Sequence, residues 1–127
     1  MTDEDVIRAC YDRLETMAGA PAIKWPNQGG AVELPRIEMQ GFANEPQTVS
    51  LGGTHRRRYL LQATVVVAEH EREWTARGIA ENVIARFGWN VAIATGLRVY
   101  RRPYSSPGFN DGPEWRLPVT IPVEVIE

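Results

Sequence analysis

The run from Arg57 to Ala68 constrains the fold more than any other part of the chain. Its side chains alternate, so that one face is wholly apolar and the other mixes apolar with polar residues. The apolar face is formed by Tyr59, Leu61, Ala63, Val65 and Val67. A strand of this kind must bury its apolar face against a core. The sequence therefore predicts a strand in a sheet that is covered better on one side.

Two amphipathic segments, roughly Asp3–Met17 and Glu71–Phe87, are predicted to form helices. Apolar residues recur in both at spacings of three and four, and a glycine follows each segment as a stop signal. Thr2 can cap the first helix, with Asp5 three residues later in a weak capping-box pattern. Both helices therefore have an apolar stripe that must be buried.

Further strands are expected at Ala22–Trp25, Leu34–Gln40, Gln47–Leu51, Leu97–Arg102 and Trp115–Val125. Gly41–Pro46 is expected to connect the second and third of these, and a loop rich in Gly, Pro, Ser and Asn, Pro103–Pro113, to join the last two. Hairpins and longer connections are mixed in this order. The predicted fold is a single α+β domain over residues 1–127, with a mainly antiparallel sheet and two helices packed on one face.

Two prolines, Pro118 and Pro122, lie within the last predicted strand. Backbone N–H groups of alternate residues point to the same neighbouring strand, so both prolines remove donors on one side. We therefore expect that side of the strand to be an unpaired sheet edge that is closed to further strand addition.

Composition excludes several classes of protein. The formal net charge of −2 argues against a whole-surface nucleic-acid binder, which should be basic. No stretch approaches the ~20 apolar residues that span a bilayer. Acids lie at the N-terminus, where a signal peptide would carry positive charge, so export by that route is not expected. Cys10 is the single cysteine, so no internal disulfide can form, and cytosolic synthesis is the simple interpretation.

No motif in the chain predicts catalysis or metal binding. The pair His70-Glu71 begins like the zinc-protease helix motif, but Trp74 occupies the place of the second histidine. Cys10 lies on the apolar face of the first predicted helix, which favours a buried, inert thiol. One cysteine and two distant histidines form no zinc set, and Ser105-Ser106 have no nucleophile context. We expect no catalytic residue, no cofactor and no metal.

Two clusters of arginines lie beside predicted strands, one of Arg56, Arg57 and Arg58 and one of Arg98, Arg101 and Arg102. The planar donor fork of arginine suits ion pairs at protein interfaces, so protein contact is the favoured interpretation. Nucleic-acid binding and an ordinary solvated surface are the alternatives, although stacking aromatics are not interleaved as in common single-strand binders. The loop Pro103–Pro113 also suits docking against a partner. The predicted protein-interface residues are Arg56, Arg57, Arg58, Arg98, Arg101, Arg102, Phe109 and Asn110.

Several short motifs follow one another along the chain after the capped first helix. They are Ile23-Lys24-Trp25-Pro26-Asn27, Leu34-Pro35-Arg36-Ile37, Gly53-Thr54-His55-Arg56-Arg57-Arg58, Ile79-Ala80-Glu81-Asn82-Val83 and Trp115-Arg116-Leu117-Pro118-Val119-Thr120-Ile121-Pro122. In this order, over most of the chain, they resemble the tail terminator proteins of long-tailed bacteriophages and related prophages. Other head–tail connector or neck completion proteins have a similar size and are an alternative.

The resemblance implies a structural virion protein, assembled in the bacterial cytoplasm, with no enzyme activity. Such proteins form a ring, usually of six subunits, at the head-proximal end of the tail tube. The ring stops tube polymerisation and provides the surface that joins the tail to the capsid. The implied partners are the tail tube protein, a head-completion or neck protein and further copies of the chain, with DNA only as passing cargo and no membrane.

Two expectations accompany this resemblance, and two other functions compete with it. The modest charge and the two prolines favour a chain that is monomeric or weakly associated until it meets the tube. Charge reversal across Arg56–Arg58 is expected to disrupt assembly and leave the fold intact. A small nucleic-acid-binding regulator that uses the arginines is one competing function. An undetected hydrolase is the other, and the absence of a paired nucleophile and base argues against it.

Overall fold

The computed structural model describes residues 2–26, 32–51, 54–70 and 73–126, without the side chains of 40–51 and 54–55. Two helices and eight strands are formed in these ranges, so the predicted α+β class is confirmed. The motif residues Asn27 and Gly53 and the predicted helix start Glu71 lie outside the described residues. The elements are α1 (Asp3–Glu15), β1 (Ala22–Lys24), β2 (Arg36–Leu51), β3 (Thr54–Ala68), α2 (Glu73–Phe87), β4 (Ala92–Ala94), β5 (Leu97–Val99), β6 (Tyr104–Ser105), β7 (Phe109–Asp111) and β8 (Glu114–Ile126).

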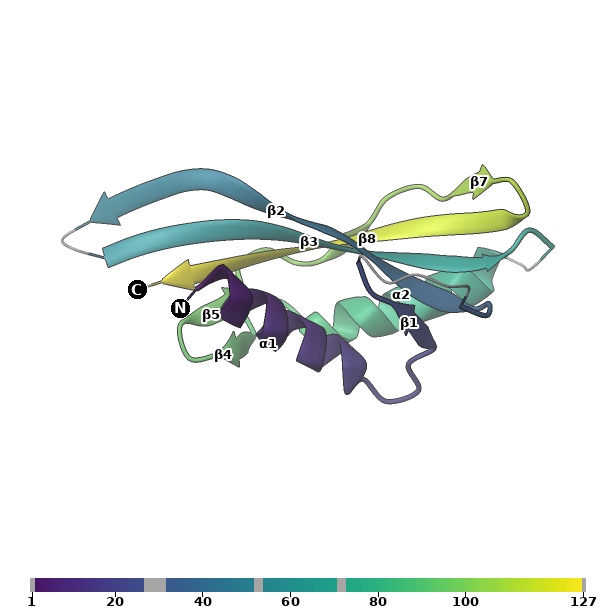
Figure 1. Cartoon of the computed structure of the whole chain (residues 1–127), viewed down its shortest axis with the longest axis horizontal. Coiled ribbons are helices and arrows are strands. Elements are labelled where there is room, and N and C mark those ends of the chain that lie inside the picture. Colours follow the sequence, from purple (N-terminus) through teal and green to yellow (C-terminus); the bar gives the residue numbers. More distant parts are fainter. Residues whose placement is uncertain (1, 27–31, 52–53, 71–72, 127) are drawn as a thin grey trace.

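All eight strands belong to one mixed, curled sheet. Its order is β1-β2-β3-β8-β5-β4, and β6 and β7 also pair with β8. β1 runs parallel to β2, whereas the other pairings are antiparallel. Figure 1 shows both helices below the long strands β2, β3 and β8, with β4 and β5 turned down beside α1. A mainly antiparallel sheet with two helices on one face is therefore too simple a description.

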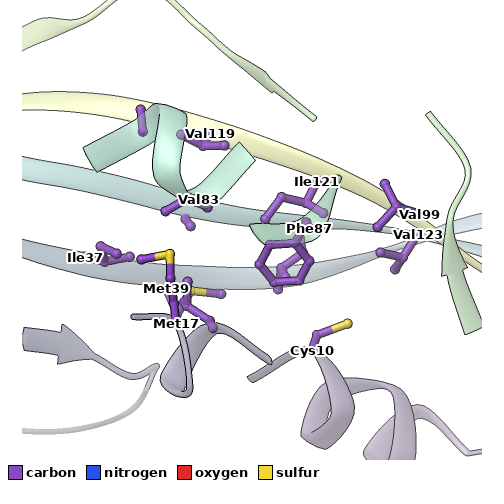
Figure 2. Close-up of a cluster of buried hydrophobic side chains, with 14 of the residues drawn as sticks. Cys10, Met17, Ile37, Met39, Val83, Phe87, Val99, Val119, Ile121 and Val123 are labelled. Atoms are coloured by element: carbon purple, nitrogen blue, oxygen red, sulfur yellow. The ribbon is translucent and has the colours of Figure 1, made fainter. Parts of the chain in front are cut away.

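The buried core lies between the helices and the long strands (Figure 2). From α1 it receives Val6, Cys10 and Leu14, and from α2 it receives Val83 and Phe87. The predicted apolar face of β3 is buried along its whole length, from Tyr59 to Val67, and the alternate residues Leu117 to Val125 of β8 are buried beside it. Burial of a Val, Leu, Ile or Phe side chain contributes about 1.5–3 kcal/mol, so this layer supplies most of the driving force for folding.

The predicted break between two strands at Gly41–Pro46 is wrong. β2 is one strand of 16 residues that pairs with β3 over its length. Its register shifts between Gln40 and Ala43 and again between Glu45 and Val49. The glycine and the proline that suggested a connection therefore lie at irregularities within a long hairpin. Such irregularities tolerate an unpaired residue or a missing donor without ending the strand.

The predicted unpaired edge at Pro118 and Pro122 is also wrong. That side of β8 pairs with three short strands, β5, β6 and β7. Tyr100 N donates to Pro122 O at 3.2 Å, and Ser106 N donates to Pro118 O at 2.9 Å. The two prolines lie where the pairing passes from one short strand to the next. Because prolines lack an N–H group, the hydrogen-bond ladder on this side of β8 is interrupted at both of them. The edge is nevertheless paired with the three short strands and is not exposed.

The remaining differences concern short elements. β6 and β7 lie inside the predicted loop Pro103–Pro113, β4 was not predicted, and β5 is shorter than the expected Leu97–Arg102. The capping box of α1 is confirmed. Thr2 Oγ1 accepts from Asp5 N at 3.2 Å, and Asp5 Oδ2 accepts from Thr2 N at 2.9 Å. These hydrogen bonds with Thr2 also lower the pKa of Asp5.

Candidate interaction surface

The strand register brings the two arginine clusters together around one buried carboxylate. Arg98 Nη2 and Nε lie 2.7 Å and 2.8 Å from Glu124 Oε1. Arg58 Nε and Arg56 Nε lie 3.4 Å and 3.6 Å from Glu124 Oε2. The Glu124 side chain is only 1% exposed. We call these four residues the Glu124 cluster.

Cross-strand pairing explains why these residues meet. Arg58 on β3 and Arg98 on β5 are the direct neighbours of Glu124 on the two sides of β8. Residues directly opposite one another in a sheet have side chains on the same face. Val123 and Val125 point into the core, so Glu124 lies on the face away from it. The sequence contained both clusters, but their meeting depends on the pairing of three strands.

Burial makes the Glu124 cluster important for stability. A buried carboxylate is strongly disfavoured unless cations and hydrogen-bond donors surround it. Arg98 supplies two short contacts to one oxygen, and Arg58 and Arg56 approach the other. The arginines are more exposed than the acid, with 44% of the side chain exposed for Arg98 and 41% for Arg56. The cluster is therefore a buried acid under a partly exposed cationic surface.

The ring of Tyr100 lies beside the Glu124 cluster and contacts two arginines. Arg58 Cζ lies 4.4 Å from the Tyr100 ring centroid, and Arg101 Cζ lies 5.1 Å from it. These distances fit cation–π contacts, which favour the flat arginine side chain. Arg101 is thus placed at the border of the Glu124 cluster, whereas Arg102 lines a shallow pocket with Trp89 and Ile84. Trp89 is 69% exposed beside it.

Arg57 points to the opposite face from its two neighbours. Its Nη1 lies 3.2 Å from Asp3 Oδ1 and 2.9 Å from Tyr59 Oη. Tyr59 Oη donates to the same carboxylate at 2.5 Å. The Tyr59 side chain is almost fully buried, so these bonds attach the first turn of α1 to β3. Arg57 therefore supports the fold on the helix side of the sheet.

Phe109 and Asn110 lie away from the Glu124 cluster. They pair with Arg116 and Trp115, near the other end of β8. Phe109 is half-exposed. The eight predicted interface residues are thus distributed over several surfaces, of which the Glu124 cluster unites three. That these residues contact partners stays a prediction.

A second ion-pair network was missed at the sequence level. Arg36 Nη2 lies 2.6 Å from Glu114 Oε2 and 2.7 Å from Glu38 Oε2. Arg116 Nη2 lies 2.8 Å from Glu114 Oε1 and 3.2 Å from Glu38 Oε2. Burial raises the pKa of Glu38, but hydrogen bonds from Arg36 and Arg116 outweigh burial, so the pKa is lowered overall. The available signal was an arginine and a glutamate two residues apart, once within the predicted strand Leu34–Gln40 and once at the start of the predicted strand Trp115–Val125, where Glu114 directly precedes it.

The candidate reactive groups do not form a site in the described part of the chain. Cys10 is buried, and burial raises the pKa of its thiol to about 12. Within the described ranges, no group of three or more His, Cys, Asp or Glu side chains is placed to hold a metal ion. None of the described helices is both long and apolar enough to cross a membrane.

Comparisons with known proteins give one matching family model and one solved structure with a similar fold. A family model described as "Phage tail terminator protein" matches residues 5–122. No curated protein matches the chain. One solved structure superposes with a TM-score of 0.69 and covers 98% of this chain and 96% of the other, at 18% sequence identity. At that identity the likeness concerns the fold alone.

Proposed function

This chain belongs to the phage tail terminator family, and we propose that it caps the head-proximal end of the tail tube as a ring. Membership makes it a structural component of a phage tail, and hence of a virion, in a family that is not normally enzymatic. In the proposed role, six copies form the ring and end polymerisation of the tube. The ring then also provides the surface that joins the tail to the capsid, to which a head-completion or neck protein binds, and DNA passes through the ring as cargo.

The extent of the family match carries this proposal. The match spans residues 5–122, from the first helix into the last strand, so it covers β1–β7 completely and β8 as far as Pro122. The arrangement of the charged residues agrees with a structural role. Two networks, around Glu124 and around Glu38 and Glu114, join strands to one another within the subunit.

The nucleic-acid alternative is weakened by the Glu124 cluster. A protein that binds DNA through counterion release needs cations directed at phosphates. In the Glu124 cluster, the carboxylate of Glu124 neutralises one of the three positive charges of Arg56, Arg58 and Arg98, and the whole chain has a net charge of −2. A DNA titration at low salt tests this directly, because a regulator would show strong, salt-sensitive binding. Absence of binding removes the alternative.

Tail assembly with and without the chain tests the proposed function. Tubes assembled without it are expected to grow to variable, excess length, whereas its addition should fix their length and place a ring at one end. Electron micrographs measure both quantities. Tubes of normal length that form without the chain, with the chain found in the neck instead, would support a head–tail connector.

The solution state needs a separate measurement. The edge at Pro118 and Pro122 is paired and does not favour a monomer, so the modest net charge of −2 is the remaining support for that expectation. Sedimentation velocity of the chain alone, without tube protein, distinguishes a monomer from a preformed ring. Stable rings in dilute solution would contradict the idea that the tube induces assembly.

A further inference from the structure

We infer that the Glu124 cluster is the surface on which the acidic outer face of α1 from a second copy of the chain docks. The inference rests on the proposed ring, because it names the two surfaces through which neighbouring subunits would meet.

The Glu124 cluster has more positive charge than it neutralises within itself. Three guanidinium groups share one carboxylate, which leaves two positive charges in excess. Arg56 and Arg58 lie 3.6 Å and 3.4 Å from Glu124, beyond the roughly 2.7–2.9 Å of strong charge-assisted hydrogen bonds. Each guanidinium carries five N–H donors, so the partly exposed arginines keep donors for further carboxylates.

The outer face of α1 has the opposite charge. Glu4, Asp5, Asp12 and Glu15 are exposed, and their spacings of seven, eight and eleven residues place them on one side of the helix. Arg8 lies among them and pairs with Glu4 at 2.7 Å. Four acids and one arginine give this face a formal charge of −3. The buried residues of α1 lie on the opposite side of the helix, so the acidic face points away from the sheet.

The two surfaces lie on opposite sides of the subunit at the same end. Arg57 lies between Arg56 and Arg58 in β3, but its side chain is on the helix side of the sheet. There it contacts Asp3, at the start of α1. Figure 1 accordingly shows α1 beginning below the C-terminal end of β8. Because both surfaces lie at the same end of the subunit, the basic surface of one copy can contact the acidic surface of the next. That contact can then repeat around an axis. This is the head-to-tail contact that closes into a ring, whereas two-fold pairing of either surface would place like charges together.

Such contacts set the orientation of neighbours more than they set affinity. Exposed ion pairs contribute little individually, but complementary charge steers association and disfavours the wrong pairing. The prediction is therefore directional. The start of α1 in one copy should lie next to Arg56 of the adjacent copy in every contact around the ring.

Crosslinking tests that direction. The variant with Glu4→Cys and Arg56→Cys, assembled on tail tubes, is expected to give a ladder of covalent species with a short bismaleimide reagent. Cys10 is buried and so contributes little background. Each single variant is the matched control and should give no species larger than a dimer. Rings that are visible in micrographs but stay monomeric after crosslinking would overturn the inference and leave the proposed function intact, whereas tubes on which the unsubstituted chain forms no rings would count against the proposed function itself.

A charge swap supplies an independent measurement. Arg56→Glu is expected to lower the fraction of capped tubes by about tenfold or more, because it places like charges at every contact. Adding Glu4→Arg should restore capping, since opposite charges then face each other again. Arg77→Glu, on the exposed surface of α2, is the matched control and should leave capping unchanged. Capping that is unaffected by Arg56→Glu, or that Glu4→Arg fails to restore, contradicts the assigned contact.

Discussion

Arg13 and Arg86 cap each other's helices. Arg13 Nε donates to Arg86 O at 2.9 Å, and Arg86 Nε donates to Arg13 O at the same distance. Both carbonyls belong to the last turn of a helix, where no further turn satisfies them. Arg86 Nη2 also donates to Thr16 Oγ1 at 2.8 Å, at the C-cap of α1. The ends of α1 and α2 are therefore joined through reciprocal charge-assisted bonds.

Arg86→Ala should destabilise the fold, because it removes hydrogen bonds that join the ends of α1 and α2. It removes two hydrogen bonds from a charged donor and leaves the Arg13 carbonyl and the Thr16 hydroxyl, at the end of α1, without that partner. We expect the free energy of unfolding to fall by about 1.5–3 kcal/mol, measured by urea denaturation. Arg77→Ala, which removes an exposed pair with Glu73 on the same helix, is the control and should change it by less than about 1 kcal/mol. Equal effects of the two substitutions would contradict the role of the reciprocal caps.

Glu124→Gln should have a larger effect than the loss of the helix caps. It leaves Arg56, Arg58 and Arg98 close together without the carboxylate that neutralises them. Breaking a buried ion pair on one side costs about 3–5 kcal/mol, and the same loss is expected here. Glu81→Gln, at an exposed position of α2, should have almost no effect in the same denaturation experiment. A variant with wild-type stability would show that the cluster is not needed for folding.

The three arginines Arg56–Arg58 differ in their contacts, so their charge reversals should differ in effect. Reversal of all three charges was expected to leave the fold intact. Arg57 bonds to Asp3 and Tyr59, and Arg58 approaches Glu124, so the triple reversal would damage both faces of the sheet. A single change at Arg56, whose contact with Glu124 is the longest of the three, separates assembly from folding more cleanly.

Local patterns predicted the long elements well. Three of these patterns depend only on residues close in sequence. They are the alternation around Val65, the apolar spacings of three and four residues in α1, and the capping box of α1. The end of a strand depends on its partner instead. β2 continues through Gly41 and Pro46 because β3 pairs with it beyond both irregularities. Short strands such as β6 form because they pair with β8, and a segment of two residues is too short for its own sequence pattern to predict a strand.

The candidate surface was only half predictable for the same reason. Arginine clusters are visible in the sequence, but the partner of Arg58 is Glu124, which lies far along the chain. A lone glutamate between two valines in an apolar strand was the missed sign, because a charge at such a position needs a buried partner. Three-strand pairing around β8 then decides which arginines reach it.

Tyr59→Phe should weaken the attachment of α1 to β3. It removes the hydroxyl that bonds to Asp3 and to Arg57, at a side chain that is almost fully buried. We expect the free energy of unfolding to fall by about 1–2 kcal/mol in urea denaturation. Tyr104→Phe is the matched control, since Tyr104 is half-exposed, and it should be nearly neutral. Amide hydrogen exchange at Val6, the first amide of α1 that donates to a backbone carbonyl, should also rise in Tyr59→Phe, and unchanged protection there would contradict the proposed attachment.

Acid should destabilise the fold partly through Glu38. Its pKa lies below the ordinary value of 4.5 in the folded protein, because hydrogen bonds from Arg36 and Arg116 outweigh the opposite effect of burial. A carboxyl group with a depressed folded pKa contributes stability that is fully present above its unfolded pKa. That contribution disappears as the pH falls below about 4.5 and through the folded pKa.

Glu38→Gln should therefore be less stable than the wild type at neutral pH and should lose less stability on acidification. Urea denaturation at a series of pH values between neutral and acid measures the difference between the two curves. The gap should narrow as the pH drops, because protonation removes the same charge from the wild type. Parallel curves over the whole range would show that the ion pairs of Glu38 with Arg36 and Arg116 do not contribute to the pH dependence.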